Sequence, residues 1–195
     1  MKKFLLLIVA GCLLVSAVQA QSSNSLAKSI GFSFFMNDFT SAQRIRSTSL
    51  NQVINDKTFA RMAEMNAGFA VNYSKQMRDR MSFSAALGVS GLRYPMPGRN
   101  ITKNGTLLEF SATINAMMTT SDYYVQPYLV LGVGAHKFDV HYGAFIPAGV
   151  GLKLNVLGDA SVVVSSTYRV PVTTETANYH FQHSIGIAAP LGKKN

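Results

Sequence analysis

Apolar residues alternate with polar or small residues along most of the chain from Ser29 onward. In the first segment, Ile30, Phe32, Phe34 and Met36 share one face, and Gly31, Ser33, Phe35 and Asn37 share the other. A period of two is that of a β-strand with two different faces. The pattern recurs in eight segments: 30–37, 64–74, 81–90, 108–118, 124–134, 143–155, 161–170 and 181–189.

The length of these segments favours a membrane barrel over a soluble sandwich. Most run to about ten residues, which is what a tilted strand needs to cross a bilayer, whereas strands of soluble sheets average about five to six. Their polar faces are rich in glycine and serine, which suits the inside of a narrow barrel. The sequence therefore predicts an all-β fold, an eight-stranded antiparallel up-and-down transmembrane β-barrel.

The connections between segments alternate in length. Longer ones are expected at 40–61, 94–105 and 173–178, and short ones at 75–80, 119–122 and 157–160. The link at 139–142 is short where a longer loop is expected. Long loops at one rim and tight turns at the other are typical of outer-membrane barrels. An even strand number then places both ends of the barrel at the rim of short turns.

Two prolines interrupt the predicted strands. Pro127 and Pro147 each remove one backbone donor from a β-ladder. Either a bulge or bend lies at each proline, or the strand boundary there is misplaced.

The first twenty residues read as a secretory signal peptide. Lys2 and Lys3 precede an apolar run over 4–15, and small residues precede a cleavage site before Gln21. The run is too short to span a membrane as a helix in the mature protein. We therefore expect a signal peptide at 1–20 and one outer-membrane barrel domain at 21–195.

Cys12 is the only cysteine of the sequence and raises one alternative. The residues Val-Ala-Gly-Cys that end there resemble a lipoprotein cleavage box, but apolar residues follow where a lipoprotein turns polar. Cleavage after residue 20 would leave no cysteine. That excludes disulfides, cysteine nucleophiles and thiolate metal sites from the mature protein.

The chain is basic, with a formal net charge of +9. An export signal argues against nucleic acid as the partner, and membrane phosphates fit better. The expected partners are outer-membrane lipids and lipopolysaccharide, with no nucleic acid. The mature sequence holds no run of eighteen apolar residues, so a helical membrane protein is excluded.

Three stretches, 126–134, 146–154 and 184–191, resemble the outer-membrane β-barrel domain common in Bacteroidetes-type bacteria. That group is akin to the small barrels of the OmpA, OmpX and opacity-protein class. The chain departs from many such barrels by ending in Lys-Lys-Asn rather than in an aromatic residue. The resemblance implies a fold and an outer-membrane location, and it carries no single activity.

The four histidines of the sequence are candidates for metal ligands and for catalytic bases. His180 and His183 are an odd number of residues apart, so they point to opposite faces of one strand. Ser184 is next to His183 and therefore on the opposite face, while His180 shares a face with Ser184 but has no obvious carboxylate nearby. His136 and His141 flank a predicted loop. We expect no metal site, no cofactor and no catalytic residues.

Three charged residues fall on the face predicted to line the lumen. These are Glu109, Lys153 and Arg169, and in a dry interior they would have to pair, because an unpaired buried charge is costly. One interpretation is a structural charge network that plugs the barrel, and the other is an ion path. An eight-stranded barrel has room for side chains and little else, which favours the plug.

The function expected from these features is non-enzymatic. A monomeric barrel would act through its place in the envelope and its exposed loops, in structural support, adhesion or surface recognition, with the ligand unidentified. The alternatives are a narrow barrel that transports small apolar molecules through a side opening, and a lipid A-modifying enzyme. The sequence favours the first of the three.

The loop lengths also predict the orientation in the membrane. The connections at 40–61 and 94–105 should face outward, and 75–80 should face the periplasm. An epitope tag inserted at Asn51 should be reached by antibody on intact cells. A tag at Met77 that was accessible while the Asn51 tag was not would show the opposite orientation.

Overall fold

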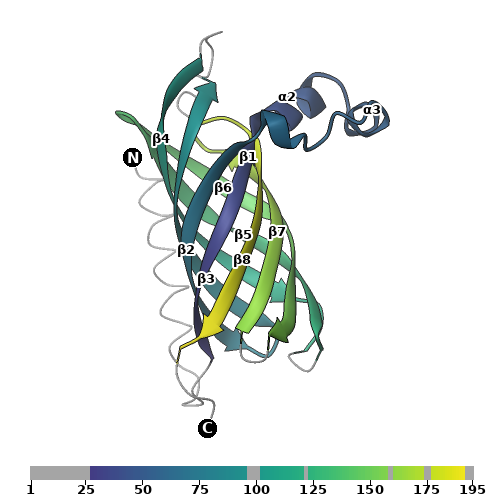
Figure 1. The fold of residues 1–195 in the computed structure, drawn as a ribbon, viewed down its shortest axis with the longest axis vertical. Helices are drawn as coiled ribbons and strands as arrows, with labels where there is room; N and C mark the ends of the chain where they lie inside the picture. The colour runs from purple at the N-terminus through teal and green to yellow at the C-terminus, as the bar shows by residue number, and fades with distance from the viewer. Residues whose placement is uncertain (1–26, 96–101, 121–122, 158–159, 174–176, 192–195) are drawn as a thin grey trace, which may run out of the picture.

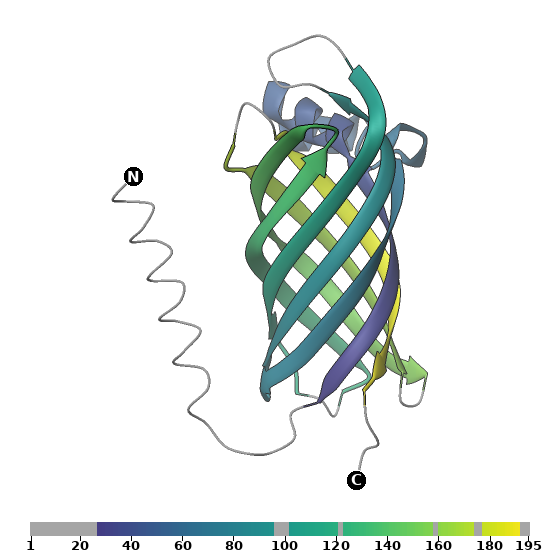
Figure 2. The same ribbon diagram turned by 90° about the vertical axis from the view of Figure 1, so that its left-hand side faces the viewer.

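The structure, a computed structural model, describes residues 27–95, 102–120, 123–157, 160–173 and 177–191. Eight strands follow one another around a closed barrel in which each strand pairs antiparallel with the next and β8 closes on β1 (Figures 1 and 2). The predicted eight-stranded antiparallel up-and-down barrel is confirmed. The proposed signal peptide and the residue Cys12 lie outside the described residues.

The strands are β1 (Lys28–Asp38), β2 (Asn66–Arg78), β3 (Met81–Pro95), β4 (Thr102–Met117), β5 (Val125–Phe138), β6 (His141–Leu157), β7 (Ala160–Pro171) and β8 (His180–Pro190). Between β1 and β2 lie α2 (Phe39–Ser47), α3 (Leu50–Asn55) and the 3-10 turn η2 (Met62–Glu64). We call residues 39–65 the helical insertion, the end of the barrel that carries it the helix rim, and the opposite end the turn rim.

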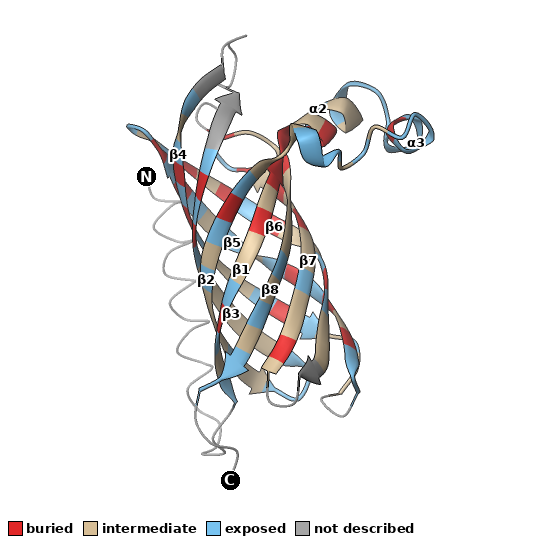
Figure 3. Ribbon diagram, in the orientation of Figure 1, coloured by how far each residue is buried: buried red, intermediate tan, exposed pale blue. Residues whose placement is uncertain are grey.

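Alternation along each strand separates the lumen from the outer wall. In β5 the side chains of Gln126, Tyr128 and Val130 are buried, while Leu129 and Leu131 between and beyond them are exposed. Figure 3 shows the same alternation of buried and exposed bands on the other strands. Apolar residues thus point outward, which is favourable when the solvent around the barrel is lipid.

The strands are long enough to cross a bilayer. The shortest have 11 residues, or roughly 36 Å at about 3.3 Å per residue. Tilted by about 45°, such a strand spans about 25 Å, the height of the apolar band of outer-membrane barrels.

Two predicted connections are shorter in the structure. The segment 94–105 was expected to be a loop, but β3 and β4 stay paired as far as Pro95 and Thr102. Likewise β2 extends to Arg78, so that only Asp79 and Arg80 separate it from β3. Backbone pairing needs no apolar alternation, so a hairpin can continue past the end of the sequence pattern.

The two strand prolines cause no bulge. Leu131 pairs with Ala148 and Gly134 pairs with Phe145, so both strands advance three residues across the segment that contains Pro147. The carbonyl of Pro127 still accepts a 2.8 Å hydrogen bond from the amide of Met118. Each proline therefore removes a donor without shifting the register. Of the expected alternatives, a bulge and a misplaced boundary were wrong, and a bend stays a prediction.

The connection expected at 40–61 contains two short helices that the strand pattern did not predict. Each begins with a capping side chain: Asp38 accepts a 2.8 Å hydrogen bond from the amide of Ser41, and Ser49 accepts one of 3.2 Å from the amide of Gln52. No helix within the described ranges is both long and apolar enough to cross a membrane. In Figure 1, α2 lies at the helix rim and α3 projects sideways from the barrel.

Glycines in the lumen make room for large aromatic rings. A Cβ atom on Gly68 would lie 2.6 Å from Cε2 of Phe35, and one on Gly88 would lie 2.9 Å from its Cε1. The ring of Phe35 is 2% exposed and fills the space that these two residues leave. A narrow barrel is thus filled by pairing large with small side chains.

We predict that Gly68→Val destabilises the barrel by about 1–3 kcal/mol, because the added methyl groups overlap the ring of Phe35. Phe35→Leu should relieve part of that loss in the double variant. Gly91 has no atom within 4 Å of the position of a Cβ, so Gly91→Val is the matched control. Urea unfolding in one detergent measures all four variants, and equal losses for Gly68→Val and Gly91→Val would contradict the packing argument.

Candidate functional site

A buried charge pair crosses the lumen near the helix rim. Arg169 on β7 forms an ion pair with Glu109 on β4, and their side chains are 4% and 3% exposed. Gln182 on β8 joins both: its Oε1 accepts a 2.6 Å hydrogen bond from Nη2 of Arg169, and its Nε2 donates one of 3.1 Å to Oε2 of Glu109. We call these three residues the charged layer.

Hydrogen bonds extend the charged layer to β1 and β3. Nε2 of Gln182 also donates to Oδ1 of Asn37 at 3.2 Å, and Nδ2 of Asn37 donates to Oγ of Ser90 at 3.4 Å. Residues from β1, β3, β4, β7 and β8 are therefore linked through one polar network. Such a network holds non-adjacent strands together across the lumen, where backbone pairing cannot.

Aromatic rings pack against the charged layer. The guanidinium of Arg169 lies 4.4 Å from the ring centroid of Phe145, which stacks on His136 at 5.9 Å. His180 stacks on Phe39 at 4.5 Å, and its Nδ1 donates to the carbonyl of Asn178 at 2.9 Å. These rings exclude water around the ion pair, which strengthens the attraction between the two charges.

The helical insertion closes the lumen beyond that layer. Phe39 at the start of α2 packs with Leu107 and Phe138 in a buried apolar cluster. The mouth of the barrel at the helix rim therefore holds an apolar layer over a charged one.

An ion pair holds the insertion together outside the barrel. Both nitrogens of Arg44 donate to Glu64, at 2.7 and 3.0 Å, and Arg44 also donates to the carbonyl of Thr58 at 3.0 Å. The hydrogen bond from Arg44 lowers the pKa of Glu64, and the same bond raises the pKa of Arg44. Both groups therefore stay charged at neutral pH and fix α2 against the segment before β2.

Lys153 does not join the charged layer. On β5, Glu109 faces His136 and Lys153 faces Gln126, which are ten residues apart. That separation is roughly 33 Å along the strand at about 3.3 Å per residue. The structure thus brings together Glu109 and Arg169 and leaves Lys153 near the turn rim, so the expected three-residue cluster is corrected to a pair.

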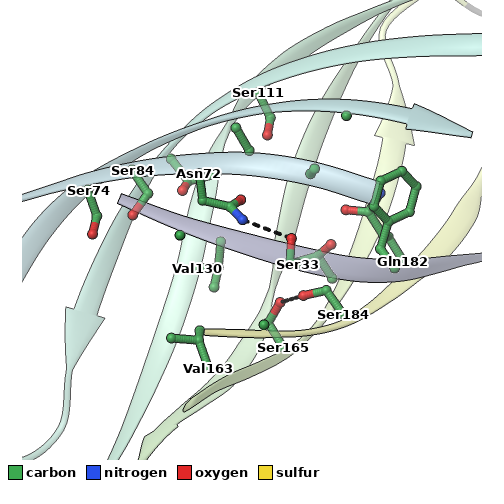
Figure 4. Close-up of a pocket in the computed structure, with 18 of the residues that line it drawn as sticks. Ser33, Asn72, Ser74, Ser84, Ser111, Val130, Val163, Ser165, Gln182 and Ser184 are labelled. Atoms are coloured by element: carbon green, nitrogen blue, oxygen red, sulfur yellow. Dashed lines mark hydrogen bonds between the residues drawn. The ribbon is translucent and has the colours of Figure 1, made fainter. Parts of the chain in front are cut away.

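A cavity of about 170 Å³, lined by both apolar and polar side chains, lies between the charged layer and the turn rim. It has room for on the order of ten water molecules. Hydroxyl and amide side chains line it and bond to one another, as Figure 4 shows for Asn72 with Ser33 at 2.8 Å and for Ser165 with Ser184 at 2.7 Å. Glu109, Arg169 and Gln182 close its end nearest the helix rim.

The histidines on β8 point to opposite faces, as their spacing predicts. His180 is buried in the lumen, whereas Nδ1 of His183 lies 2.9 Å from Oγ of Ser166 on the outer wall. Ser184 bonds Ser165 inside the barrel and contacts neither histidine in the described hydrogen bonds. Among the described residues no group of three metal-ligating side chains forms a site.

Two polar partners of the charge pair were not predicted from the sequence. Alternation places Gln182 and Asn37 on the lumen face, but their contact with Glu109 or with each other depends on the register of β8 against β1, where Asn37 faces Gln182. His136 and His141 flank the turn between β5 and β6, as predicted, and the burial of His136 was not foreseen. Composition gave no signal for these contacts.

The chain resembles known outer-membrane barrels in structure. OprG from Pseudomonas aeruginosa has a TM-score of 0.54 and 8% identity, covering 88% of this chain and 99% of OprG. The N-terminal β-barrel domain of Pseudomonas aeruginosa OprF has a TM-score of 0.52 and 10% identity, covering 84% and 97%. Neisserial surface protein A has a TM-score of 0.50 and 13% identity, covering 88% and 100%. The sequence matches no family model and no curated protein at a significant level.

The closed eight-stranded barrel, with its apolar outer wall and the charged layer in its lumen, has the fold of the outer-membrane β-barrels OprG and OprF. The wall exposes large apolar side chains such as Phe32 and Phe69, at 69% and 67%. A surface of that kind is stable in lipid rather than in water. The protein is located in the outer membrane, and the Bacteroidetes-type grouping stays a prediction.

We predict that Glu109→Ala destabilises the barrel by roughly 3–5 kcal/mol, because it leaves the charge of Arg169 buried without its partner. Arg169→Ala should destabilise it too, and the double variant should lose less than the sum of the two single losses. Urea unfolding of the three variants in one lipid or detergent measures this coupling.

Lys153→Ala provides the matched control, since it removes a lumen-facing charge far from the pair. Its effect should be additive with that of Glu109→Ala. Additive losses below about 1 kcal/mol for Glu109 and Arg169, the scale of exposed ion pairs, would show that the lumen is solvated there and would support an ion path.

Proposed function

We propose that this protein is a non-enzymatic outer-membrane barrel with a plugged lumen, which acts at the cell surface through its helical insertion. The observation that carries the proposal is the closure of the helix rim by the ion pair of Glu109 and Arg169. A barrel closed in this way serves structural support, adhesion or surface recognition better than transport. The 27-residue insertion is then the part of the described structure that can meet partners outside the membrane.

Burial supports a plug rather than an open path. The ion pair is nearly inaccessible, and Phe145 and His180 pack beside it. A hydrated channel would leave these charges in contact with water and would weaken their attraction. The cavity between this layer and the turn rim then holds water that satisfies the hydroxyl groups in its lining, as buried waters commonly do.

Transport of small apolar molecules fits the lumen poorly. The charged layer closes one end of the cavity, and serine, threonine and asparagine side chains stand among the apolar ones that line the rest. An apolar solute would have to displace water from these polar groups without replacing their hydrogen bonds. The ladder between β5 and β6 keeps one register on both sides of Pro147, which argues against a side opening at that proline.

A lipid-modifying activity would require a nucleophile and a base on the lipid-facing wall. Ser166 and His183 are paired there, and a catalytic site of this type also needs a third group that orients the histidine. Among the described residues, the charge of Asp38 acts on His183, but the two form no ion pair, and Asp38 instead accepts a hydrogen bond from the amide of Ser41. We therefore interpret the Ser166–His183 pair as two polar side chains that satisfy each other on an apolar wall.

The same features indicate how the barrel is oriented in the membrane and which lipids surround it. The helix rim faces the cell exterior, because it carries the helical insertion and the long β3–β4 hairpin. Lipopolysaccharide and other outer-membrane lipids surround a monomeric barrel. Residues 1–20 act as the export signal.

Conductance in planar bilayers tests the plug. Purified protein that is shown to be folded by its heat-dependent gel mobility should give no steady conductance steps. Steady steps whose ion selectivity changed in Glu109→Ala would reject the plug and favour a channel. The Lys153→Ala variant controls for a general change in lumen charge.

A further inference from the structure

The helical insertion leaves the mouth of the barrel and passes over its outer wall. Phe59 lies with its ring centroid 5.5 Å from that of Phe181 and 6.2 Å from that of His183, both on β8. Figure 1 shows α3 well to the side of the barrel, and the view in Figure 2 places both helices at the same rim. Only the start of the insertion, at Phe39, therefore packs into the lumen. The rest of it overhangs the lipid-facing wall.

Large apolar side chains are exposed on this overhang. Leu50 and Ile54 of α3 are 52% and 54% exposed, and Met62 is 72% exposed. Leu50 and Ile54 are four residues apart, so they share one face of the helix. Val53 faces the insertion itself and is buried. In water this exposed face would be unfavourable, but it lies beside a wall that is itself in lipid.

Basic side chains accompany the apolar ones. The insertion has four basic residues and two acidic ones. Arg44 and Glu64 pair with each other, and Arg61 lies 3.9 Å from the same carboxylate with 48% of its side chain exposed. Arg46 and Lys57 are also exposed. The overhang thus presents a basic surface next to an apolar one, which is the composition of segments that lie in a membrane interface.

Arg46 is held in place by aromatic side chains of the barrel. Its guanidinium lies 3.9 Å from the ring centroid of Tyr179, which stacks on Tyr168 of β7 at 5.9 Å. Stacking fixes the plane of the guanidinium while its N–H groups remain able to donate. A fixed arginine at the level of the aromatic residues is well placed to bind a phosphate of a neighbouring lipid.

We propose that the helical insertion rests on the outer leaflet and binds a phosphorylated glycolipid of the lipid A type. Arg46, Lys57 and Arg61 contact its phosphates, and Leu50, Ile54 and Met62 lie among its acyl chains. The inference rests on the proposed outward orientation of the helix rim. It adds a specific binding site on the insertion and the residues that recognise the lipid.

The depth of the insertion can be measured with tryptophan, because the sequence contains none. Leu50→Trp and Met62→Trp, each in the intact barrel, should be quenched by lipids that carry bromine on their acyl chains. Gln52→Trp, on the opposite face of α3, is the matched control and should be quenched far less. Equal quenching at the three positions, whether strong or absent, overturns the proposal.

Phosphate recognition is tested by titrating the Leu50→Trp protein with diphosphorylated lipid A. Neutralising Arg46, Lys57 and Arg61 to Gln should weaken binding by up to about a hundredfold, since each basic residue near an anionic surface contributes about fivefold. Neutralising three exposed basic residues at the turn rim, Lys28, Lys75 and Arg80, should change nothing. Unchanged binding after neutralisation in the insertion overturns the proposal.

Two further probes identify the lipid. Dephosphorylated lipid A should bind weakly, and phosphatidylglycerol vesicles should bind more weakly than diphosphorylated lipid A. Equal binding of phosphatidylglycerol would overturn the glycolipid assignment. Gel mobility and conductance are recorded on the same samples, so that a folded, non-conducting barrel that fails to bind lipid A contradicts this inference alone and leaves the plugged barrel intact.

Discussion

Closure of the hydrogen-bonded ladder between β1 and β8 is the constraint on which the rest of the structure depends. In lipid, every backbone donor and acceptor must find a partner within the protein, and a sheet achieves this only by leaving no edge. The ten residue pairs from Ser29 with Pro190 to Asp38 with Phe181 complete the circle. Because the ladder is continuous, the missing donor of Pro147 does not shift the register of β5 and β6. For the same reason, β3 and β4 stay paired beyond the apolar band.

Closing a ladder of only eight strands fixes a narrow lumen, and the lumen in turn decides which residues fit. Phe35 occupies space left by Gly68 and Gly88, so a large ring requires small neighbours. A charge inside so narrow a space meets little water, and Glu109 therefore needs Arg169. Gln182 adds one hydrogen bond to each of them, accepting from Nη2 of Arg169 and donating to Oε2 of Glu109. The apolar wall and the charged interior both follow from the closed eight-stranded sheet, whose outer face meets lipid and whose inner face encloses a narrow lumen.

The period-two pattern was sufficient to predict the strand number, the closed barrel and the face of each residue, because pleating alone sets which way a side chain points. It correctly placed Glu109 and Arg169 in the lumen. It grouped Lys153 with them because alternation predicts only which side of the sheet a residue faces. The position of a residue along the barrel axis depends on the register of each strand pair, which no single sequence segment specifies. The helices were missed for a different reason, since their capping residues Asp38 and Ser49 lie outside any alternating segment.

The separation of the lumen from the insertion explains how one barrel can be both rigid and adapted to its surroundings. The charged layer uses buried groups that bond to one another, so that their partners lie within the protein. The insertion does the opposite: its exposed leucine, isoleucine and methionine, together with exposed basic groups, have their best partners outside it. Phe39 connects the two, because it begins α2 and also packs in the lumen against Leu107 and Phe138. Substitutions on the overhang can therefore change what the protein binds while the barrel that holds it stays closed.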